Sequence, residues 1–386
     1  MQFNLNEDQL AFQDAARQFA QKELAPHASE WDANKIFPRE AITRAGELGF
    51  CGIYTSDKGG GLGLSRLDAA IIFEELAAAC PSTTAYISIH NMVTWMLDNY
   101  ATENIKKRWT QQLASGVLLG SYCLTEPEAG SDAASLNTTA VRRGDKYVIN
   151  GTKAFISGAG ESDLLIVMAR TGCSGSKGIS AFVLESNSKG VSFGENEKKL
   201  GWNTQPTRFV FLENVEVDAG QLLGKEGEGF KIALHGLDGG RINIGVCSVG
   251  AAQGALNQAQ TYMHQRKQFG KSLTQFQALQ FKIADMITEL VAARQMAYLA
   301  AFKLDTNDPD ATIYCAMAKR LCTDVCFNIC NNALQILGGY GCTQDFPVER
   351  LMRDSRIHQV VEGTNEIMKL VISRRVLQEG GLLHIR

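Results

Sequence analysis

A glutamate near the C-terminus has the setting best suited to proton transfer. Glu362 follows two valines and precedes a glycine in the run HQVVEGTNEIM, residues 358–368. Apolar neighbours partly desolvate a carboxylate and raise its pKa toward the range of a general base. The plainer interpretation is a surface glutamate at a helix start, with Thr364 as the N-cap. Taken alone, the run favours that plainer interpretation.

A turn-forming run in the middle of the chain offers polar groups to a ligand. YCLTEPEAGSD, residues 122–132, carries hydroxyls on Thr125 and Ser131. Gly130 has no Cβ atom, so the backbone there can approach a ligand closely. A structural turn explains the same residues, and from this run alone it is the better explanation.

A second run, KAFISGAG at residues 153–160, ends a predicted strand in Ser and Gly. Side chains two positions apart in a strand lie on one face, so Phe155 and Ser157 are expected to face the same side. A flat ring system could rest against that face. A cross-strand packing pair is equally consistent with the spacing.

Two further runs could bind an anion. RKQFGKSLTQFQALQ (266–280) is an amphipathic stretch with a break at Gly270. Its Arg266 suits pyrophosphate because a guanidinium donates two parallel hydrogen bonds, although a solvated helix end is the plainer explanation. QILGGYG (335–341) ends a helix in three glycines and exposes backbone N–H groups, as a nest for oxygens or as a simple C-cap.

The cysteines favour packing over metal binding. The chain has ten cysteines and no CxxC pair, which indicates a reduced, intracellular protein. Cys322, Cys326 and Cys330 recur every four residues and would line one helix face. No histidine or paired CxxC accompanies them, so we expect packing thiols and no metal site.

Composition excludes several classes of protein. The 386 residues carry a formal net charge of −3, which excludes nucleic-acid binding through bulk charge. No apolar stretch reaches 18 residues, so no membrane span is expected. The N-terminus resembles neither a signal peptide nor a transit peptide. We expect a cytoplasmic bacterial protein, or a mitochondrial matrix protein if the chain is a processed eukaryotic one.

The elements that must position these residues fall into three regions. Helical periodicity covers residues 1–120, short β-branched and aromatic runs cover 121–225, and helical periodicity returns over 226–386. This order predicts a mostly helical α+β fold with three domains. Strands do not alternate with helices, so a Rossmann fold is disfavoured.

In series, these motifs resemble the acyl-CoA dehydrogenase family. TEPxxGSD, a strand ending in Ile-Ser, RxxFG, QxxGGxG and EGT occur in the family's order, and the resemblance covers essentially the whole chain. It implies an N-terminal helical domain, a middle β-barrel or sandwich and a C-terminal four-helix bundle. The runs at 82–92, 150–163, 200–208 and 236–244 most resemble a branched-chain member.

The resemblance implies FAD-dependent α,β-dehydrogenation of a short branched-chain acyl-CoA. Glu362 stands at the position of the family's base, and its backbone N–H would hold the thioester oxygen together with a ribityl hydroxyl of FAD. Electrons would pass to electron-transferring flavoprotein. The assembly implied is a homotetramer, a dimer of dimers.

The resemblance also assigns binding residues. FAD contacts would fall on Tyr122, Leu124, Thr125, Ser131, Phe155, Ile156, Ser157, Thr364, Asn365 and Glu366. The adenosine and pyrophosphate end, bound by a neighbouring subunit, would use Arg266, Phe269, Gln277, Gln335, Gly338 and Gly339. The acyl-CoA would contact Ser131, Asp238, Gly239, Gly240, Arg241 and Gly363.

Two positions bear on alternatives. Glu128 stands where the family commonly has Gly, and it would be strained if the turn needed a positive φ. Another branch of the family carries its base on the helix where this chain has Gly240, which favours Glu362 as the base. Three other possibilities are a dehydrogenase for 2-methylbutyryl- or butyryl-CoA, an oxidase, and a non-enzymatic assembly protein. The chain length argues against the oxidase, and the retained Glu362 and flavin motifs argue against the assembly protein.

Overall fold

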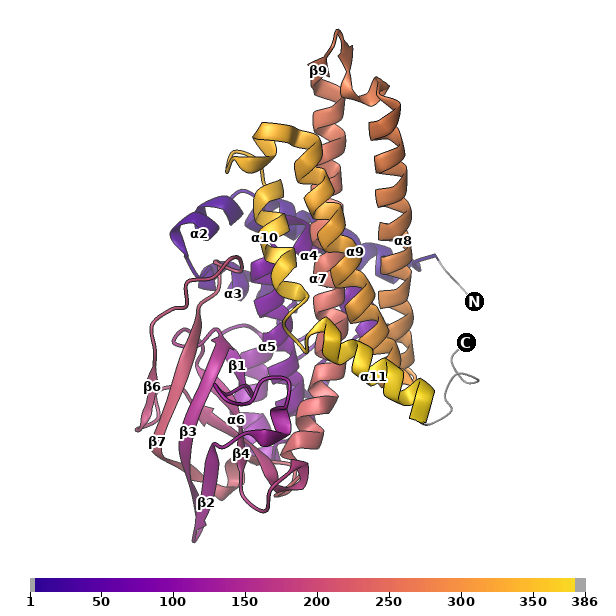
Figure 1. Ribbon diagram of the computed structural model, residues 1–386. Helices are drawn as coiled ribbons and strands as arrows, with labels where there is room; N and C mark the ends of the chain where they lie inside the picture. Colours follow the sequence, from indigo (N-terminus) through magenta and orange to yellow (C-terminus); the bar gives the residue numbers. More distant parts are fainter. Residues whose placement is uncertain (1–3, 379–386) are drawn as a thin grey trace.

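Two groups of helices, separated along the chain by a sheet, pack together with the sheet at one side (Figure 1), which confirms the mostly helical α+β class. The computed structural model describes residues 4–378. The first helices are α1 (Glu7–Phe19), α2 (Ala28–Asn34), α3 (Arg39–Glu47), α4 (Arg66–Ala79), α5 (Pro81–Tyr100) and α6 (Glu103–Ala114). The last helices are α7 (Gly229–Gln265), α8 (Gln277–Asp305), α9 (Ala311–Leu337), α10 (Val348–His358) and α11 (Asn365–Gln378).

The strands between them are β1 (Gly120–Cys123), β2 (Thr139–Arg143), β3 (Lys146–Ser157), β4 (Leu164–Arg170), β5 (Ile179–Glu185), β6 (Val191–Phe193), β7 (Thr207–Asp218) and β8 (Leu222–Leu223). They are ordered β6-β7-β3-β2-β4-β5-β8, with β1 parallel to β4.

This sheet folds over on itself. Leu165 and Val167 of β4 share a core cluster with Tyr147 of β3 and Val215 of β7. The alternate residues of β4, such as Ile166, pack against the helices instead. Strands β2 and β4 pair at Thr139 and Arg170 alone, so the sheet bends at that junction. A strand buried on both faces therefore links a sandwich-like layer to the helices.

The helical segments before and after the sheet share one core. Helix α4 packs against α7 and α8, while α10 lies against α7 and α9. One apolar cluster joins Phe19 of α1, Phe73 of α4 and Val246 of α7. A reciprocal capping box begins α1, where the Asn6 side chain accepts from the Gln9 N–H and the Gln9 side chain accepts from the Asn6 N–H.

The regular cysteines pack inside this core, as expected. Cys322, Cys326 and Cys330 are buried on α9, and burial raises the pKa of each thiol. Within residues 4–378, no group of three or more His, Cys, Asp or Glu side chains could hold a metal ion. In the same range, no helix is long and apolar enough to cross a membrane.

A β-hairpin joins α7 to α8 at the far tip of the helices (Figure 1). Strands β9 (Lys267–Gln268) and β10 (Lys271–Ser272) pair antiparallel around Phe269 and Gly270. Both turn residues have positive φ, +52° and +76°. This is the geometry of a two-residue hairpin turn that matches strand twist. The break expected at Gly270 is therefore a hairpin that leaves the Phe269 side chain 92% exposed.

Candidate functional site

Glu362 lies in the short loop between α10 and α11, and its carboxylate points inward. Glu362 and Gly363 both have left-handed backbone, with φ of +56° and +89°. Carboxylate oxygen Oε2 is buried and has no hydrogen-bond partner among residues 4–378. Thr364 does cap α11, because its hydroxyl accepts from the Ile367 N–H at 3.3 Å. The cap is as the plainer interpretation expects, but the glutamate carboxylate is not on the surface.

A glycine on α7 makes room for this carboxylate. A Cβ atom at Gly240 would lie 2.5 Å from Glu362 Oε2 and 3.6 Å from Met92 Sδ of α5. One turn earlier, a Cβ atom at Gly236 would overlap the Met96 side chain of α5. The carboxylate and two methionines therefore meet along a face of α7 that lacks side chains.

The electrostatic setting suits a base. Burial raises the pKa of Glu362 to about 7, against the opposing charges of Arg241 and Lys319. Burial and the Glu362 charge likewise raise the pKa of Tyr122. In the part of the chain that the structure describes, the Tyr122 hydroxyl and the buried Nε of Arg241 have no hydrogen-bond partner. Unsatisfied polar atoms of three charged or polar side chains thus gather at one place, as in a site built to receive a polar ligand.

Two of the residues expected to contact substrate are bonded to each other. Asp238 accepts from Arg241 at 2.6 Å and from the Thr312 hydroxyl at 2.7 Å. Gly239 lies against the Arg66 guanidinium, which sits 3.5 Å from the centre of the Tyr54 ring.

The turn run is held against β3 by a buried ion pair. Nζ of Lys153 donates to Glu126 at 2.7 Å and to the Leu124 carbonyl at 3.1 Å. The Ala154 N–H donates to the Thr125 carbonyl at 2.9 Å. These bonds place Leu124 and Thr125 beside the end of β3, where Ile156 is buried in the sheet core.

The end of β3 departs from the expected alternation. The register with β7 shifts between Lys153 and Ile156, and Phe155 has a φ of +56°. Such a bulge breaks the period of two, so the argument that put Phe155 and Ser157 on one side does not hold across it. Phe155 is nevertheless 62% exposed, so its ring is an open aromatic surface next to Ala154, whose N–H bonds the Thr125 carbonyl.

Most of the remaining turn residues are exposed, although Ala129 is buried. Ser131 lies at the surface, and a Cβ atom on Gly130 would meet nothing within 4 Å. Glu128 is exposed and is not among the residues with positive φ. The strain considered for Glu128 is therefore absent.

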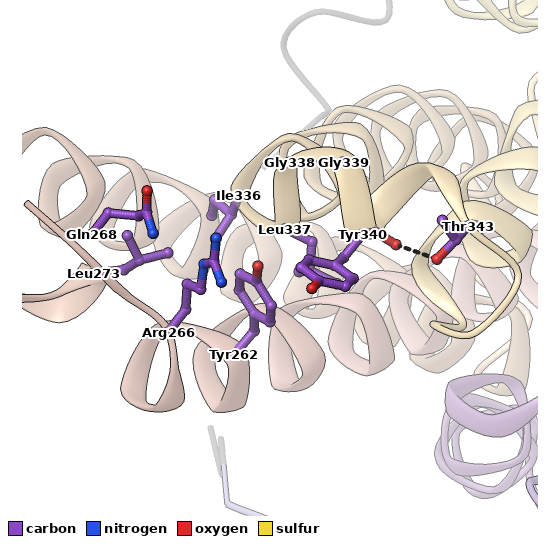
Figure 2. Close-up of a pocket in the computed structure, with 10 residues that line it drawn as sticks. All are labelled: Tyr262, Arg266, Gln268, Leu273, Ile336, Leu337, Gly338, Gly339, Tyr340 and Thr343. Atoms are coloured by element: carbon purple, nitrogen blue, oxygen red, sulfur yellow. Dashed lines mark hydrogen bonds between the residues drawn. The ribbon is translucent and has the colours of Figure 1, made fainter.

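A cavity of about 530 Å³ lies near the tip of α7 and the end of α9 (Figure 2). Arg266 and Tyr262 rise from one helix toward Ile336 and Leu337 of the other. Gly338 and Gly339 line the same cavity, and Cβ atoms there would meet nothing within 4 Å. The structure thus brings Arg266, Gly338 and Gly339 together, whereas the side chains expected beside them lie outside the lining: Phe269, Gln277 and Gln335.

The two groups of expected flavin contacts lie at different ends of the chain's fold. Arg266 follows α7 beside β9, at one extreme of Figure 1, and β3 with its Phe155 belongs to the sheet in the opposite half. The third group, Thr364, Asn365 and Glu366, is at the start of α11. Glu366 is exposed, whereas Asn365 is buried and bonded within the protein.

Several residues around Glu362 were not anticipated, and Lys319 is the clearest. It is fully buried on α9, on the same side as Cys315 and Cys322. The sequence could have indicated that Lys319 is buried, because a lysine three or four positions from two core cysteines occupies a core position of an amphipathic helix. The Arg66 and Met92 contacts carry no comparable signal, because they depend on how α4 and α5 meet α7.

Comparisons with known proteins agree with this architecture. Models of the acyl-CoA dehydrogenase N-terminal, middle and C-terminal domains match residues 6–117, 121–215 and 227–377. The mitochondrial isobutyryl-CoA dehydrogenase of Bos taurus is 51% identical over 97% of this chain and 90% of that protein. Butyryl-CoA dehydrogenase from Megasphaera elsdenii has a TM-score of 0.95 and 39% identity, covering 98% of this chain and 100% of that one. PigA, solved with FAD and proline, has a TM-score of 0.94 and 29% identity, covering 97% and 99%.

Proposed function

The chain belongs to the acyl-CoA dehydrogenase family, and from that premise we propose that it oxidises a short branched-chain acyl-CoA, isobutyryl-CoA, to methacrylyl-CoA in valine breakdown. The observation that carries the proposal is the buried, unpartnered Oε2 of Glu362 above Gly240. With a pKa of about 7, the Glu362 carboxyl is about half ionised near neutral pH, so a base able to accept a proton is present there.

FAD is the cofactor of this family, and the residues present fit it. Phe155 offers an exposed ring near the end of β3, and Arg266 opens onto a cavity next to two unobstructed glycines. When bound, FAD supplies the acceptor for the hydride that leaves the β-carbon of the acyl chain.

The chain's own residues handle the proton and the thioester. Glu362 Oε2 removes the α-proton, while its backbone N–H donates to the thioester oxygen and stabilises the developing negative charge. That N–H is free for this role, because it bonds no carbonyl of residues 4–378. Packing around the loop excludes water from the carboxylate and keeps its proton affinity high.

Two observations support a short acyl chain. Helix α5 carries the run STTAYISIHNM, and its residues are buried. Met92 and Met96 of this helix press against the glycine face of α7 within one helical turn of the Glu362 contact. These thioethers limit the depth of the space beside the proposed base. A longer acyl chain would overfill that space, at a cost of about 1–3 kcal/mol.

We further propose that the complete site forms between two chains. The Arg266 cavity and the Phe155 surface are far apart in one chain, so a single extended cofactor could contact both only if two subunits share it. A symmetric dimer builds two such sites, and a dimer of dimers gives the homotetramer. Electron-transferring flavoprotein is the proposed electron acceptor.

The test compares Glu362→Gln with the wild-type holoenzyme. The amide keeps the shape of the side chain but cannot accept the proton, so FAD content should be retained while anaerobic bleaching of the flavin by isobutyryl-CoA is lost. Turnover within a few-fold of wild type would remove Glu362 from the role of base.

A substrate panel tests the acyl chain separately. We expect kcat/KM for octanoyl-CoA to be at least about tenfold below that for isobutyryl-CoA. Butyryl-, 2-methylbutyryl- and isovaleryl-CoA complete the panel. If isovaleryl- or octanoyl-CoA were the best substrate, the isobutyryl assignment would fail and the dehydrogenase would stand.

A further inference from the structure

A buried lysine holds the loop that carries the base. Nζ of Lys319 donates to the Gly363 carbonyl at 2.7 Å, to Asn365 Oδ1 at 2.9 Å and to the Gln359 carbonyl at 3.2 Å. An ammonium group has three protons, and here each one has an acceptor. The three acceptors lie on both sides of Glu362 in the chain, so a single side chain spans the whole loop.

The same stretch of α9 holds the loop a second time. Oδ1 of Asp324 accepts from Asn365 Nδ2 at 2.6 Å and from Gln359 Nε2 at 2.8 Å. Thr323 also bonds the Asn365 amide, with 2.9 Å between Oγ1 and Nδ2. Residues 319–324 of α9 therefore fix both ends of the loop, while Glu362 between them contributes no bond of its own from Oε2.

Fold stability alone does not explain a lysine here. A buried ammonium is costly unless it is well paired, and no carboxylate bonds Lys319 in the described part of the chain. An apolar residue would fill this position of α9 more cheaply. The loop it secures has two consecutive residues in the left-handed region, a conformation that surrounding contacts must maintain.

We propose that Lys319 is a positioning residue for α-proton abstraction, which holds the backbone on both sides of Glu362 so that the carboxylate stays over Gly240. This inference rests on the proposed role of Glu362 as the base. Lys319 contacts the loop and not the reacting atoms, so it acts through the placement and charge of Glu362.

The charge of Lys319 also affects the pKa of Glu362. Lys319 and Arg241 lower the pKa of Glu362 against the effect of burial, and burial in turn lowers the pKa of Lys319 to about 7. Removing the ammonium should therefore raise the pKa of Glu362. The other titratable or charged groups near this pair, from the elements packed around it, are Tyr54, Tyr122, Asp324, His358 and Glu366.

The experiment uses the FAD-loaded enzyme with Lys319→Met, Lys319→Gln and Lys319→Arg. Lys282→Met is the matched control, because Lys282 of α8 also bonds a side-chain amide on α9, Asn332 Oδ1 at 3.1 Å. Measurements are kcat and KM for isobutyryl-CoA across pH, thermal stability, and amide hydrogen exchange of residues 359–368. The methionine removes both bonds and charge, the glutamine restores donors without charge, and the arginine keeps the charge.

We expect kcat of Lys319→Met to fall by about tenfold or more with little change in KM, because a misplaced base loses transition-state stabilisation. The acid limb of the pH profile of kcat should move to higher pH in this variant. Amide hydrogen exchange should become faster only in the loop that carries Glu362. Lys319→Gln should recover loop protection but keep the shifted limb, and Lys319→Arg should keep the limb near wild type.

Two outcomes would overturn the proposal. One is a Lys319→Met or Lys319→Gln enzyme with kcat, pH profile and loop exchange equal to Lys282→Met. The other is exchange that rises throughout the protein in all three Lys319 variants, which would indicate a general structural role. Retained activity in Glu362→Gln would instead refute the proposed base, whatever the lysine variants do.

Discussion

Replacement of Gly240 by alanine adds one atom, Cβ, which should reduce the catalytic rate without reducing the stability of the protein. The added Cβ would lie 2.5 Å from Glu362 Oε2 and 3.1 Å from its Cδ. Ordinary contact begins near 3.4 Å, so the carboxylate must withdraw by about 1 Å. Because the obstructing atom is the end of a flexible side chain, the fold can accommodate this movement, but the base leaves its position.

The expected loss of rate follows from that displacement. A misplacement of about 1 Å in a catalytic group can reduce the rate by about 10²-fold, or ~2.7 kcal/mol of transition-state stabilisation. Alanine also favours the helix interior over glycine by about 1 kcal/mol, so the melting temperature should stay level or rise. Gly240→Ala should therefore combine a low kcat with undiminished stability and FAD content.

The same helix supplies a matched control in Gly245→Ala. A Cβ atom at Gly245 would meet the Cys322 Cβ at 3.6 Å, an ordinary contact, so only the gain in helix propensity should appear. The assay measures kcat and KM for isobutyryl-CoA with an artificial electron acceptor, beside thermal unfolding of both variants. If kcat of Gly240→Ala came within twofold of Gly245→Ala, the carboxylate would not need the position seen here.

Three more predictions follow from the described contacts. Glu362 must be ionised to act, so kcat/KM should fall about tenfold per pH unit below its pKa of about 7, and a flat profile from pH 5 to 8 would contradict this. Lys153→Met should destabilise by about 3–5 kcal/mol because Glu126 loses its buried partner, and adding Glu126→Gln should restore part of that loss in denaturant titrations. Glu362→Gln and Arg266→Ala subunits, each inactive alone, should regain activity when refolded together, since one of the two shared sites in a mixed dimer is intact. Absence of any regain would place the whole site in one chain.

Patterns that repeat along the sequence predicted the architecture well. Helical and strand periods change near residues 120 and 225, and the strands of the large sheet begin with β1 at Gly120 and end with β8 at Leu223. The packing of the α9 cysteines was also predictable from the sequence, because it depends on residues spaced one helical turn apart.

Contacts between segments that are distant in the sequence could not be predicted in the same way. The bulge at Phe155 arises from the register between β3 and β7, and spacing within β3 alone cannot indicate it. The hairpin at Phe269 required a positive φ at a bulky residue, which local propensity disfavours. The order of the motifs assigned Glu362 its proposed role through family resemblance. The space that Gly240 leaves for the Glu362 carboxylate depends on how α7 packs against the loop, so the sequence could not predict it.

The contacts around Glu362 explain how a loop can hold the proposed base. A helix or strand would fix Glu362 through its own hydrogen bonds, whereas this loop relies on Lys319, Thr323 and Asp324 of α9 for its shape. That arrangement leaves the Glu362 N–H and Oε2 without bonds to other groups of residues 4–378, as the proposed contacts of both with the thioester require. The same cation that shapes the loop offsets part of the desolvation that raises the base's pKa. Lys319 therefore contributes both to the position and to the proton affinity of Glu362, and its replacement should alter both together.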